Sequence, residues 1–494
     1  MCGIAGTWGA DDPQIVVAML DRLAHRGPDA EGIFSAPGRD GTLGHRRLSI
    51  VDVDGGDQPL VSGPRALVAN GEIYNAPSLR HEMEDERRFA TRSDNEVILH
   101  LLAEADPSVT ARLRGMFAFA LARDGELILG RDPIGIKPLY TGRNQGSMVF
   151  SSELRAFPAG TTDVEPFAPG TVWSSRTGRH RYYEVPDPDP VAGDLADHAR
   201  RVRDALATAV ARQLMSDVPV GAFLSGGLDS SAIVALLRPH VDELHTFSVG
   251  LAGSPDLAAA RLVADHLDTT HHEYVLDPAE IRAALPEIVA TLESFDQDLV
   301  RSAVPTWFTA RLAAEHVKVV LTGEGADELF AGYRYHKDLQ SDEALQADAR
   351  RALAGLHHAN LQRVDRITMA HALEARVPFL DVDVIATALS IPAGLRRPGE
   401  GAPEKTVLRM AVADLLPGSV VWRDKAQFDE GTGTAGLLPA LAADDRLDVE
   451  SYRARFPSTP LRSAEECLYH RLLRASLPDP APVLANVARW ADRG

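Results

Sequence analysis

The apolar and polar residues follow a strand-like pattern in the first part of the chain. Residues 115–121 form one apolar run, Asp124-Gly125 interrupts it, and residues 126–130 form a second run. Residues 175–183 repeat this arrangement. Short apolar runs joined by turn residues are typical of antiparallel strands. The pattern therefore predicts a series of hairpins up to about residue 185.

Two further features complete the first part. Asn70-Gly71 follows an apolar run, and Asn-Gly is a strong signal for a hairpin turn. Residues 14–24 and 94–104 have spacings that suit helices. We therefore expect an α+β domain with substantial antiparallel sheet.

The second part alternates between the two kinds of pattern. Helices are predicted at 195–214, 230–237 and 256–267, and strands at 218–224, 244–249 and 317–321. Such alternation predicts an α/β domain with a parallel sheet covered by helices on both faces. Ligands of such folds bind at the carboxyl ends of the strands, so the loops after Leu224 and Leu321 are the informative ones.

A run of alternating proline and aspartate at 186–190 separates the two parts, because it can hold neither a ladder nor a helix interior. The predicted organisation is a domain at 1–185, a linker at 186–194, a second domain at 195–480 and a tail at 481–494. Residues 424–436 are rich in Gly, Thr and acidic residues and are expected to form a mobile loop.

Composition narrows the class of protein. The chain has 494 residues, 45% of them hydrophobic, and a net charge of −19, which disfavours nucleic acid as a main partner. No apolar run is long enough to span a membrane and no secretory leader is recognisable, so we expect a cytoplasmic protein. The two cysteines, Cys2 and Cys467, exclude a disulfide framework, and Cys467 is expected to be a packing residue. The oligomeric state, including a homodimer, stays open.

Cys2 is the most informative candidate for chemistry. Removal of Met1 would leave an α-amine and a thiol on one residue. The amine has an ordinary pKa of about 7.7–8.0 and can act as a base, while the thiolate is a strong nucleophile. The following residues, Gly3 to Gly6, are small and apolar and suit a buried strand rather than a frayed end.

The loop after Leu224 has the composition of a phosphate cradle. It lies between a predicted strand and helix, its glycines permit close backbone approach, and its serines add donors. It is not a Walker loop, because no Gly-Lys-Ser/Thr follows. Its aspartate indicates magnesium. The candidate residues of this loop are Ser225, Gly226, Gly227, Asp229 and Ser230.

The loop after Leu321 brings acidic residues to the same edge of the predicted sheet. Thr322 and Gly323 follow the strand, Glu324 is a candidate proton acceptor, and Asp327 could share magnesium with the aspartate of the first loop. A cation must still meet the phosphates, and Lys425 is the candidate.

In their order, these motifs resemble the glutamine-hydrolysing asparagine synthetases with an N-terminal nucleophile. The resemblance runs over nearly the whole chain. Its motifs are Cys2-Gly3-Ile4, His25 to Asp29, His45 to Val51, Asn70 to Asn75, Arg131 to Tyr140, Ser225 to Ser231, Gly323 to Glu328 and Met369 to Asp381, the last of which we interpret mostly as scaffolding.

The resemblance implies a glutaminase site in the first domain. Cys2 would attack the side-chain amide of glutamine. Arg47 and Asp94 would hold the carboxylate and ammonium of glutamine, and Asn70 and the Gly71 amide would stabilise the oxyanion. The family positions that hold glutamine and the oxyanion are Arg47, Asn70, Gly71, Glu72 and Asp94.

The resemblance also implies a synthetase site in the second domain, which the released ammonia would reach through the interior. There ATP would adenylate a carboxylate, and ammonia would displace AMP. The family positions are Leu224, Val249 and Gly323 for the nucleotide, Asp229 and Asp327 for Mg²⁺, Glu324 for the proton and Arg301 for the acceptor's carboxylate.

One residue departs from the family pattern. The position three before Arg301 is commonly Thr and helps to hold aspartate, whereas this chain has Asp298. A further carboxylate would repel an anionic acceptor unless it faces the acceptor's ammonium.

The leading hypothesis is synthesis of asparagine from aspartate, glutamine and ATP. The alternatives are the same chemistry on another carboxylate in specialised metabolism or peptide modification, an adenylating cyclase, and a non-catalytic protein. Cyclase relatives lack the terminal cysteine, so Cys2 argues against the cyclase.

Overall fold

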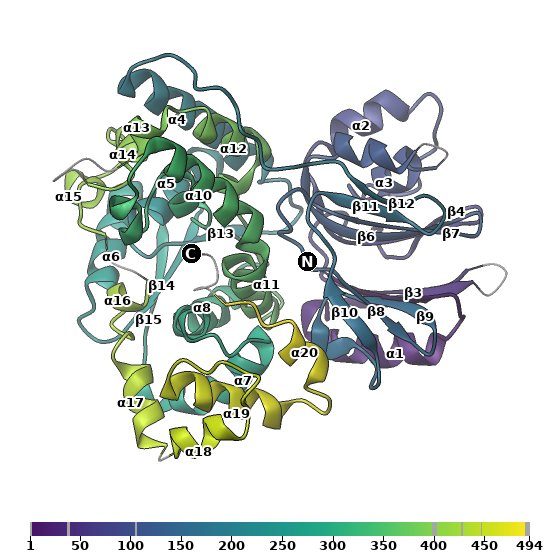
Figure 1. Cartoon of the computed structure of the whole chain (residues 1–494). Coiled ribbons are helices and arrows are strands. Elements are labelled where there is room, and N and C mark those ends of the chain that lie inside the picture. Colours follow the sequence, from purple (N-terminus) through teal and green to yellow (C-terminus); the bar gives the residue numbers. More distant parts are fainter. Residues whose placement is uncertain are drawn as a thin grey trace.

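A computed structural model of the chain describes residues 2–36, 40–103, 106–397, 403–425, 428–445 and 447–489. The described chain forms two parts that lie side by side (Figure 1). Two antiparallel sheets make up the N-terminal part, and a parallel sheet among helices makes up the other. The predicted fold class is confirmed for both parts.

Two six-stranded antiparallel sheets form the N-terminal part. The first has the order β10-β8-β9-β1-β3-β2, and the second has the order β12-β11-β7-β6-β5-β4. Apolar side chains of both, among them Ile4, Val68 and Phe150, share one core cluster between the sheets. The strands are β1 Gly3–Trp8, β2 Ala30–Ser35, β3 Gly41–Arg47, β4 Leu60–Ser62, β5 Arg65–Ile73, β6 Gly115–Arg123, β7 Glu126–Arg131, β8 Tyr140–Asn144, β9 Ser147–Ser151, β10 Thr162–Pro166, β11 Thr171–Ser174 and β12 Gly178–Arg181.

The predicted hairpin of β6 and β7 is confirmed, and the one at 175–183 is shifted so that its strands are β11 and β12. Helix α1 (Pro13–Arg22) packs on β3, and helix α3 (Glu96–Leu101), shorter than predicted, contacts β5. Helix α2 (Ala76–Met83) packs beside α3.

The predicted turn at Asn70-Gly71 is wrong, because both residues continue strand β5. Asn70 pairs with Ala118 and Gly71 with Phe117 of β6. Gly71 has a φ of +143°, and a Cβ there would lie 1.9 Å from the Met116 carbonyl oxygen. The glycine thus permits a close approach of two strands, which the Asn-Gly signal does not distinguish from a turn.

A five-stranded parallel sheet with the order β15-β14-β13-β16-β17 organises the second part. Helix α8 contacts β14 and β15, and so does α6. The strands are β13 Val220–Phe223, β14 His245–Gly250, β15 Thr270–Val275, β16 Val319–Leu321 and β17 Glu374–Arg376. The predicted strands and helices of this part are all present, with ends that differ by at most two residues.

Helices account for most of the remaining chain. They are α4 Leu195–Arg212, α5 Leu228–Leu237, α6 Pro255–Leu267, α7 Pro278–Leu292, α8 Gln297–Ala314, α9 Ala326–Leu329, α10 Asp342–Gly355, α11 Asn360–Met369, α12 Val382–Leu389, α13 Ala393–Arg396, α14 Thr406–Val412, α15 Gly418–Val421, α16 Phe428–Gly431, α17 Leu437–Asp444, α18 Val449–Ala454, α19 Ala464–Ser476 and α20 Ala481–Ala485. The loop expected at 424–436 contains α16, and part of it lies outside the described residues. No described helix combines the length and apolar character that crossing a membrane requires.

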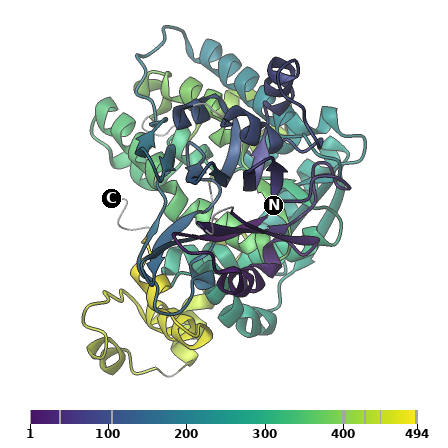
Figure 2. The same ribbon diagram turned by 90° about the vertical axis from the view of Figure 1, so that its right-hand side faces the viewer.

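The two parts meet along α11, which faces the N-terminal sheets (Figure 1). Figure 2, which has the N-terminal part in front, shows the sheets lying across the second part. Residues 186–194 form neither helix nor strand, and α4 begins directly after them with a capping box of Asp194 and Asp197. The domain boundaries proposed from the sequence stay a prediction, and the segment expected as a tail from residue 481 begins with helix α20.

Candidate active sites

Cys2 lies directly before β1, a strand inside the first sheet. Its backbone N–H donates to Asn70 Oδ1 (3.1 Å), and its carbonyl accepts from Arg26 Nε (3.0 Å). Its Sγ lies 4.0 Å from the Leu48 carbonyl oxygen. Burial raises the pKa of the thiol above its ordinary value. A thiol in this state needs a base close by, and the α-amine exposed by removal of Met1 would be on the same residue.

Asn70 and Gly71 lie beside Cys2 on β5. The Asn70 side chain is fully buried, and within the described structure its Nδ2 has no hydrogen-bond partner. A buried amide donor without a partner costs free energy of about 1–3 kcal/mol, so such a group calls for an acceptor. An oxyanion formed next to Cys2 is an acceptor of this kind.

Arg47, at the end of β3, holds the segment 51–57 against the site. Its guanidinium donates to the Val51, Asp52 and Val53 carbonyls and pairs with Asp57 Oδ1 at 2.8 Å. The Asp57 side chain is 71% exposed. The carboxylate of glutamine could therefore take the place of Asp57 without disturbing the three backbone contacts.

Glu72 and Asp94 form an acidic pair in the same region. Burial raises the pKa of Asp94 to about 6 and that of Glu72 well above its ordinary value. The Ile73 N–H donates to Asp94 Oδ2 (2.6 Å), while Glu72 Oε2 is buried with no partner among the described residues. Arg376 of β17, from the segment interpreted as scaffolding, approaches Glu72 to 3.8 Å. The second domain thus contributes the positive charge of Arg376 to the first site. No sequence motif predicted this contribution.

A cavity of about 590 Å³ lies at the carboxyl ends of β13 and β16. It is the place predicted for the second site. Of the residues predicted there, all except Gly226 line it: Leu224, Ser225, Gly227, Asp229, Ser230, Val249, Asp298, Arg301, Thr322, Gly323, Glu324, Asp327 and Lys425. The Gly226 backbone instead packs on α6, where a Cβ would lie 2.4 Å from the Ala260 nitrogen.

Lys405 joins the two aspartates proposed to hold magnesium. Its Nζ lies 2.5 Å from Asp229 Oδ2 and 2.5 Å from Asp327 Oδ1, and Lys425 also pairs with Asp327. Burial alone would lower the pKa of Lys405, but the two carboxylates raise it above its ordinary value. No sequence motif contains Lys405, and it lies far from both loops in the chain, so its place in the site could not be predicted.

The donor set at these aspartates fits a hard cation. Asp229 Oδ1 is buried and has no hydrogen-bond partner in the described part of the chain. Mg²⁺ prefers one or two carboxylate oxygens together with phosphate oxygens and waters. One unpartnered carboxylate oxygen, facing a cavity large enough for a nucleotide, meets this requirement.

Glu324 and Arg301 are each paired with a residue that sequence reasoning missed. Arg363 of α11 pairs with Glu324 and donates to Thr306 Oγ1 (3.0 Å). Glu465 of α19 pairs with Arg301 through two contacts, one of them 3.1 Å from Arg301 Nε. Both partners come from later helices and could not be paired with these loops by spacing.

Asp298 stands between two cations. Its carboxylate lies 4.0 Å from Arg301 Nη1 and 3.5 Å from Arg462 Nη2, and its side chain is 36% exposed. Burial raises its pKa, and these arginines act in the opposite direction. The charge of Asp298 is therefore partly neutralised before any acceptor binds.

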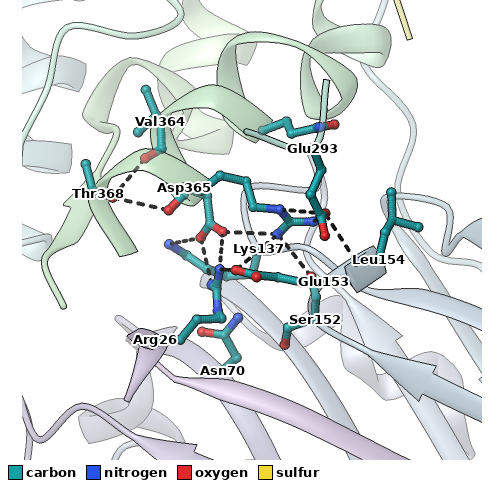
Figure 3. A network of polar contacts seen from close by, with 12 residues as sticks. Arg26, Asn70, Lys137, Ser152, Glu153, Leu154, Glu293, Val364, Asp365 and Thr368 are labelled. Carbon is teal, nitrogen blue, oxygen red and sulfur yellow. Dashed lines mark hydrogen bonds and ion pairs between the residues drawn. The ribbon is translucent and has the colours of Figure 1, made fainter. Parts of the chain in front are cut away.

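A buried network of charges connects the first site to α11 (Figure 3). The carboxylate of Asp365 accepts two hydrogen bonds from Arg26, at 2.8 and 3.2 Å, and Arg26 also pairs with Glu153 at 2.8 Å. The same Arg26 holds the Cys2 carbonyl. Helix α11 also carries Arg363. It is therefore linked to the backbone of the proposed nucleophile through Asp365 and Arg26, and to the proposed base through Arg363.

Family models match both parts of the chain. A glutamine amidotransferase domain model matches residues 1–169, and an asparagine synthase model matches residues 201–354 and 337–486. The chain is 37% identical over 513 residues to asparagine synthetase B (glutamine-hydrolyzing) of Escherichia coli K12, covering 97% of this chain and 92% of that one. It is 39% identical over 532 residues to the glutamine-hydrolyzing asparagine synthetase 3 of Arabidopsis thaliana, covering 99% and 91%.

A more distant likeness exists among solved structures. The glutamine phosphoribosylpyrophosphate amidotransferase of B. subtilis matches with a TM-score of 0.33 and 21% identity, over 55% of this chain and 65% of that chain. A likeness at this level carries no argument about function.

Proposed function

The chain belongs to the family of glutamine-hydrolysing asparagine synthetases, and on that premise we propose that it makes asparagine from aspartate, glutamine and ATP. The reaction consumes glutamine at Cys2 and releases AMP and pyrophosphate at the cavity of the second domain. The observation that supports the proposal is that residue types suited to each half-reaction lie together, around Cys2 in the first part and around the cavity in the second.

At the first site, the Cys2 thiol loses its proton to the α-amine and its sulfur attacks the side-chain amide of glutamine. The unpartnered Asn70 Nδ2 donates to the developing oxyanion. Collapse of that intermediate expels ammonia, which takes its extra proton from the α-ammonium, and leaves a thioester. Water hydrolyses the thioester to glutamate and frees the thiol. Asp94 binds the ammonium of glutamine as a carboxylate, and Arg47 binds its carboxylate in place of Asp57.

At the second site, the backbone amides after β13 and the cations Lys405 and Lys425 surround the phosphates of ATP. Asp229 and Asp327 would hold Mg²⁺, which supplies charge neutralisation at the phosphate oxygens. The acceptor carboxylate attacks the α-phosphate and displaces pyrophosphate. Ammonia then attacks the acyl-adenylate, Glu324 accepts a proton, and AMP leaves.

The proposed acceptor site offers both a positive and a negative side chain, Arg301 and Asp298. An amino acid carries a carboxylate and an ammonium group, so it can pair with both. Arg301 would bind the side-chain end or the α-carboxylate of aspartate, and Asp298 would face its ammonium. The separation of 4.0 Å between Arg301 Nη1 and Asp298 suits a ligand that carries both charges. The same chemistry on a different carboxylate is the alternative, and the family relationship does not favour it.

A product assay separates these proposals. Purified protein receives ATP, Mg²⁺ and glutamine with aspartate or with one of several other small carboxylates, and amide, AMP and ADP are quantified. We expect asparagine and AMP in equal amounts from aspartate and slower reaction with the others. ADP as the stoichiometric product would reject the adenylating mechanism, and a faster reaction with another carboxylate would reject aspartate. A cytoplasmic location and a homodimer stay predictions.

A further inference from the structure

Three histidines gather at the edge of the parallel sheet away from the cavity. His245 is the first residue of β14, His272 lies in β15, and His316 lies in the short connection between α8 and β16. Each offers one ring nitrogen, and the three nitrogens lie within 4.8 Å of one another. Neither proposed half-reaction uses these residues.

The backbone fixes the three side chains on one face. In the parallel register His272 pairs with Phe247. His245 precedes Phe247 by two residues in the same strand, so His245 and His272 lie on the same face of the sheet. The His316 N–H donates to the Ala313 carbonyl (3.0 Å), which ties His316 to the end of α8. The rings of His272 and His316 stack with centroids 3.9 Å apart, and Phe247 stacks behind His272 at 5.2 Å.

The ring nitrogens of the three histidines lie too close together for all three rings to be protonated, and this arrangement suits a shared metal ion. His245 Nδ1 lies 3.0 Å from His272 Nε2, so one nitrogen must carry the proton and the other the lone pair. Three protonated imidazoles in contact would repel one another. Accordingly, burial and then the charges of His316 and His245 lower the pKa of His272. Neutral imidazole is the form that binds metal.

The distances suit zinc with a small adjustment. Zn–N bonds of about 2.0–2.1 Å at a tetrahedral angle place two nitrogens about 3.3 Å apart. The first pair already lies at 3.0 Å, and His316, the exposed member, can turn its ring to close the third position. The outward nitrogen of His245 lies 3.9 Å from the carboxylate of Glu243, where a second partner commonly orients a ligating histidine.

We propose that His245, His272 and His316 form a binding site for Zn²⁺ or a similar late divalent transition metal, with water completing the coordination. Imidazole is a favoured ligand of these metals, and three histidines with an open position are a known protein arrangement for zinc. The site is separate from the proposed Mg²⁺ ligands, because it lies at the opposite end of the strands.

The test uses the full-length protein with the Cys2→Ala change, which removes the thiol as a competing ligand, and with excess Mg²⁺ to fill the carboxylate site. After chelator treatment, Zn²⁺ is titrated in competition with a chromophoric chelator. Co²⁺ is then added as a spectroscopic probe of tetrahedral nitrogen ligands. We expect one tight equivalent of Zn²⁺ per chain.

The variants His316→Ala and His272→Ala should each weaken Zn²⁺ binding by more than the roughly 10–100-fold that loss of an outer partner costs. His240→Ala changes an exposed histidine outside the cluster and should leave the affinity unchanged. His316 is exposed, so its variant keeps the test valid even if His272→Ala fails to fold. No tight equivalent in the parent protein, or an equal equivalent in His316→Ala, would overturn the proposal.

Discussion

The two proposed reaction centres satisfy their charges in different ways. In the first, Cys2, Arg47, Asn70, Glu72 and Asp94 are each at most 9% exposed. In the second, three charged side chains that line the cavity are partly exposed. Asp229, Asp327 and Arg301 expose 25–27% of their surface, and each is paired with an opposite charge.

The difference follows from what each centre must bind. Glutamine offers one planar amide, so a buried site with an unpartnered donor can be complementary to its oxyanion before the reaction begins. ATP and a carboxylate bring several negative charges, which need cations such as Lys405 and a cavity open enough to admit them. Activity at the first centre should therefore depend most on single groups, such as the Cys2 thiol. Activity at the second centre should depend most on the balance of positive and negative side chains.

The largest effect is expected from Cys2→Ala. It removes the nucleophile, so glutamine hydrolysis should fall by roughly 10⁴-fold or more. Ammonia-supported synthesis should change by no more than about twofold, because distant sites behave independently. Glutamate and asparagine release are measured in parallel, and Cys467→Ala, a buried cysteine of α19, is the control. Residual hydrolysis at the parent rate would reject Cys2, and intact mass should show Met1 absent from active protein.

Lys405→Met should damage the second centre alone. It leaves Asp229 and Asp327 without the cation between them, and it removes a positive charge from the place proposed for the phosphates. Synthesis should slow by roughly 10²–10³-fold while glutamine hydrolysis persists. The control is Lys337→Met, since Lys337 pairs with Glu404 nearby and is 49% exposed. Unchanged synthesis in Lys405→Met would show that the phosphates do not need this charge.

Asp365→Asn tests whether α11 links the centres. The change keeps the shape but weakens the two bonds that hold Arg26, and bonds to charged groups contribute about 1.5–3 kcal/mol. Glutamine hydrolysis should fall about 10- to 100-fold, with ammonia-supported synthesis largely kept. Thr368→Val is the matched control, because the hydroxyl that it removes donates to the Val364 and Asp365 carbonyls of the same helix. An equal loss of both activities would indicate disruption of the interface instead.

The pH dependence should also distinguish the centres. Burial raises the pKa of Asp94 to about 6, and its ionised form is the one proposed to hold the ammonium of glutamine. As pH falls through that value Asp94 gains a proton, so kcat/KM for glutamine should drop about tenfold per pH unit below it. Asp94→Asn should lower kcat/KM throughout and remove this limb. If kcat/KM of the variant still falls at acidic pH, the titrating residue is not Asp94.

The smallest effect is expected from Asp298→Thr. Two arginines already neutralise much of this carboxylate, and its side chain is partly exposed. The KM for aspartate should therefore change by less than about fivefold, and kcat hardly at all. Steady-state kinetics with saturating ATP and ammonia measure both. A large fall in KM would mean that Asp298 repels the acceptor, which would weaken the assignment of aspartate.

Local pattern predicted most of the fold because strands and helices here follow their expected periods. The parallel sheet and the importance of its carboxyl-edge loops followed from alternation alone, and Asp229 and Asp327 of these loops both contact Lys405. The Asn70-Gly71 turn was misread because strand pairing with β6 overrides the local turn preference.

The pairings that complete the sites could not be read from the sequence. Three pairs complete the second site: Lys405 with Asp229, Arg363 with Glu324, and Glu465 with Arg301. The partners are 176, 39 and 164 residues apart in the sequence. Such contacts depend on how helices pack, and no residue period encodes that packing. Arg376 is a similar case, because it reaches Glu72 across the boundary between the two parts.

Transfer of labelled nitrogen between the two centres tests directly whether glutamine hydrolysis supplies the nitrogen for asparagine synthesis. Wild-type protein is given glutamine labelled with ¹⁵N in its side-chain amide, together with aspartate, ATP, Mg²⁺ and excess unlabelled ammonia, and the asparagine is analysed by mass spectrometry. We expect asparagine enriched in ¹⁵N well above the mixing ratio, with one AMP per asparagine. Asparagine labelled only to the level of the bulk ammonia, or formed with ADP, would contradict this expectation.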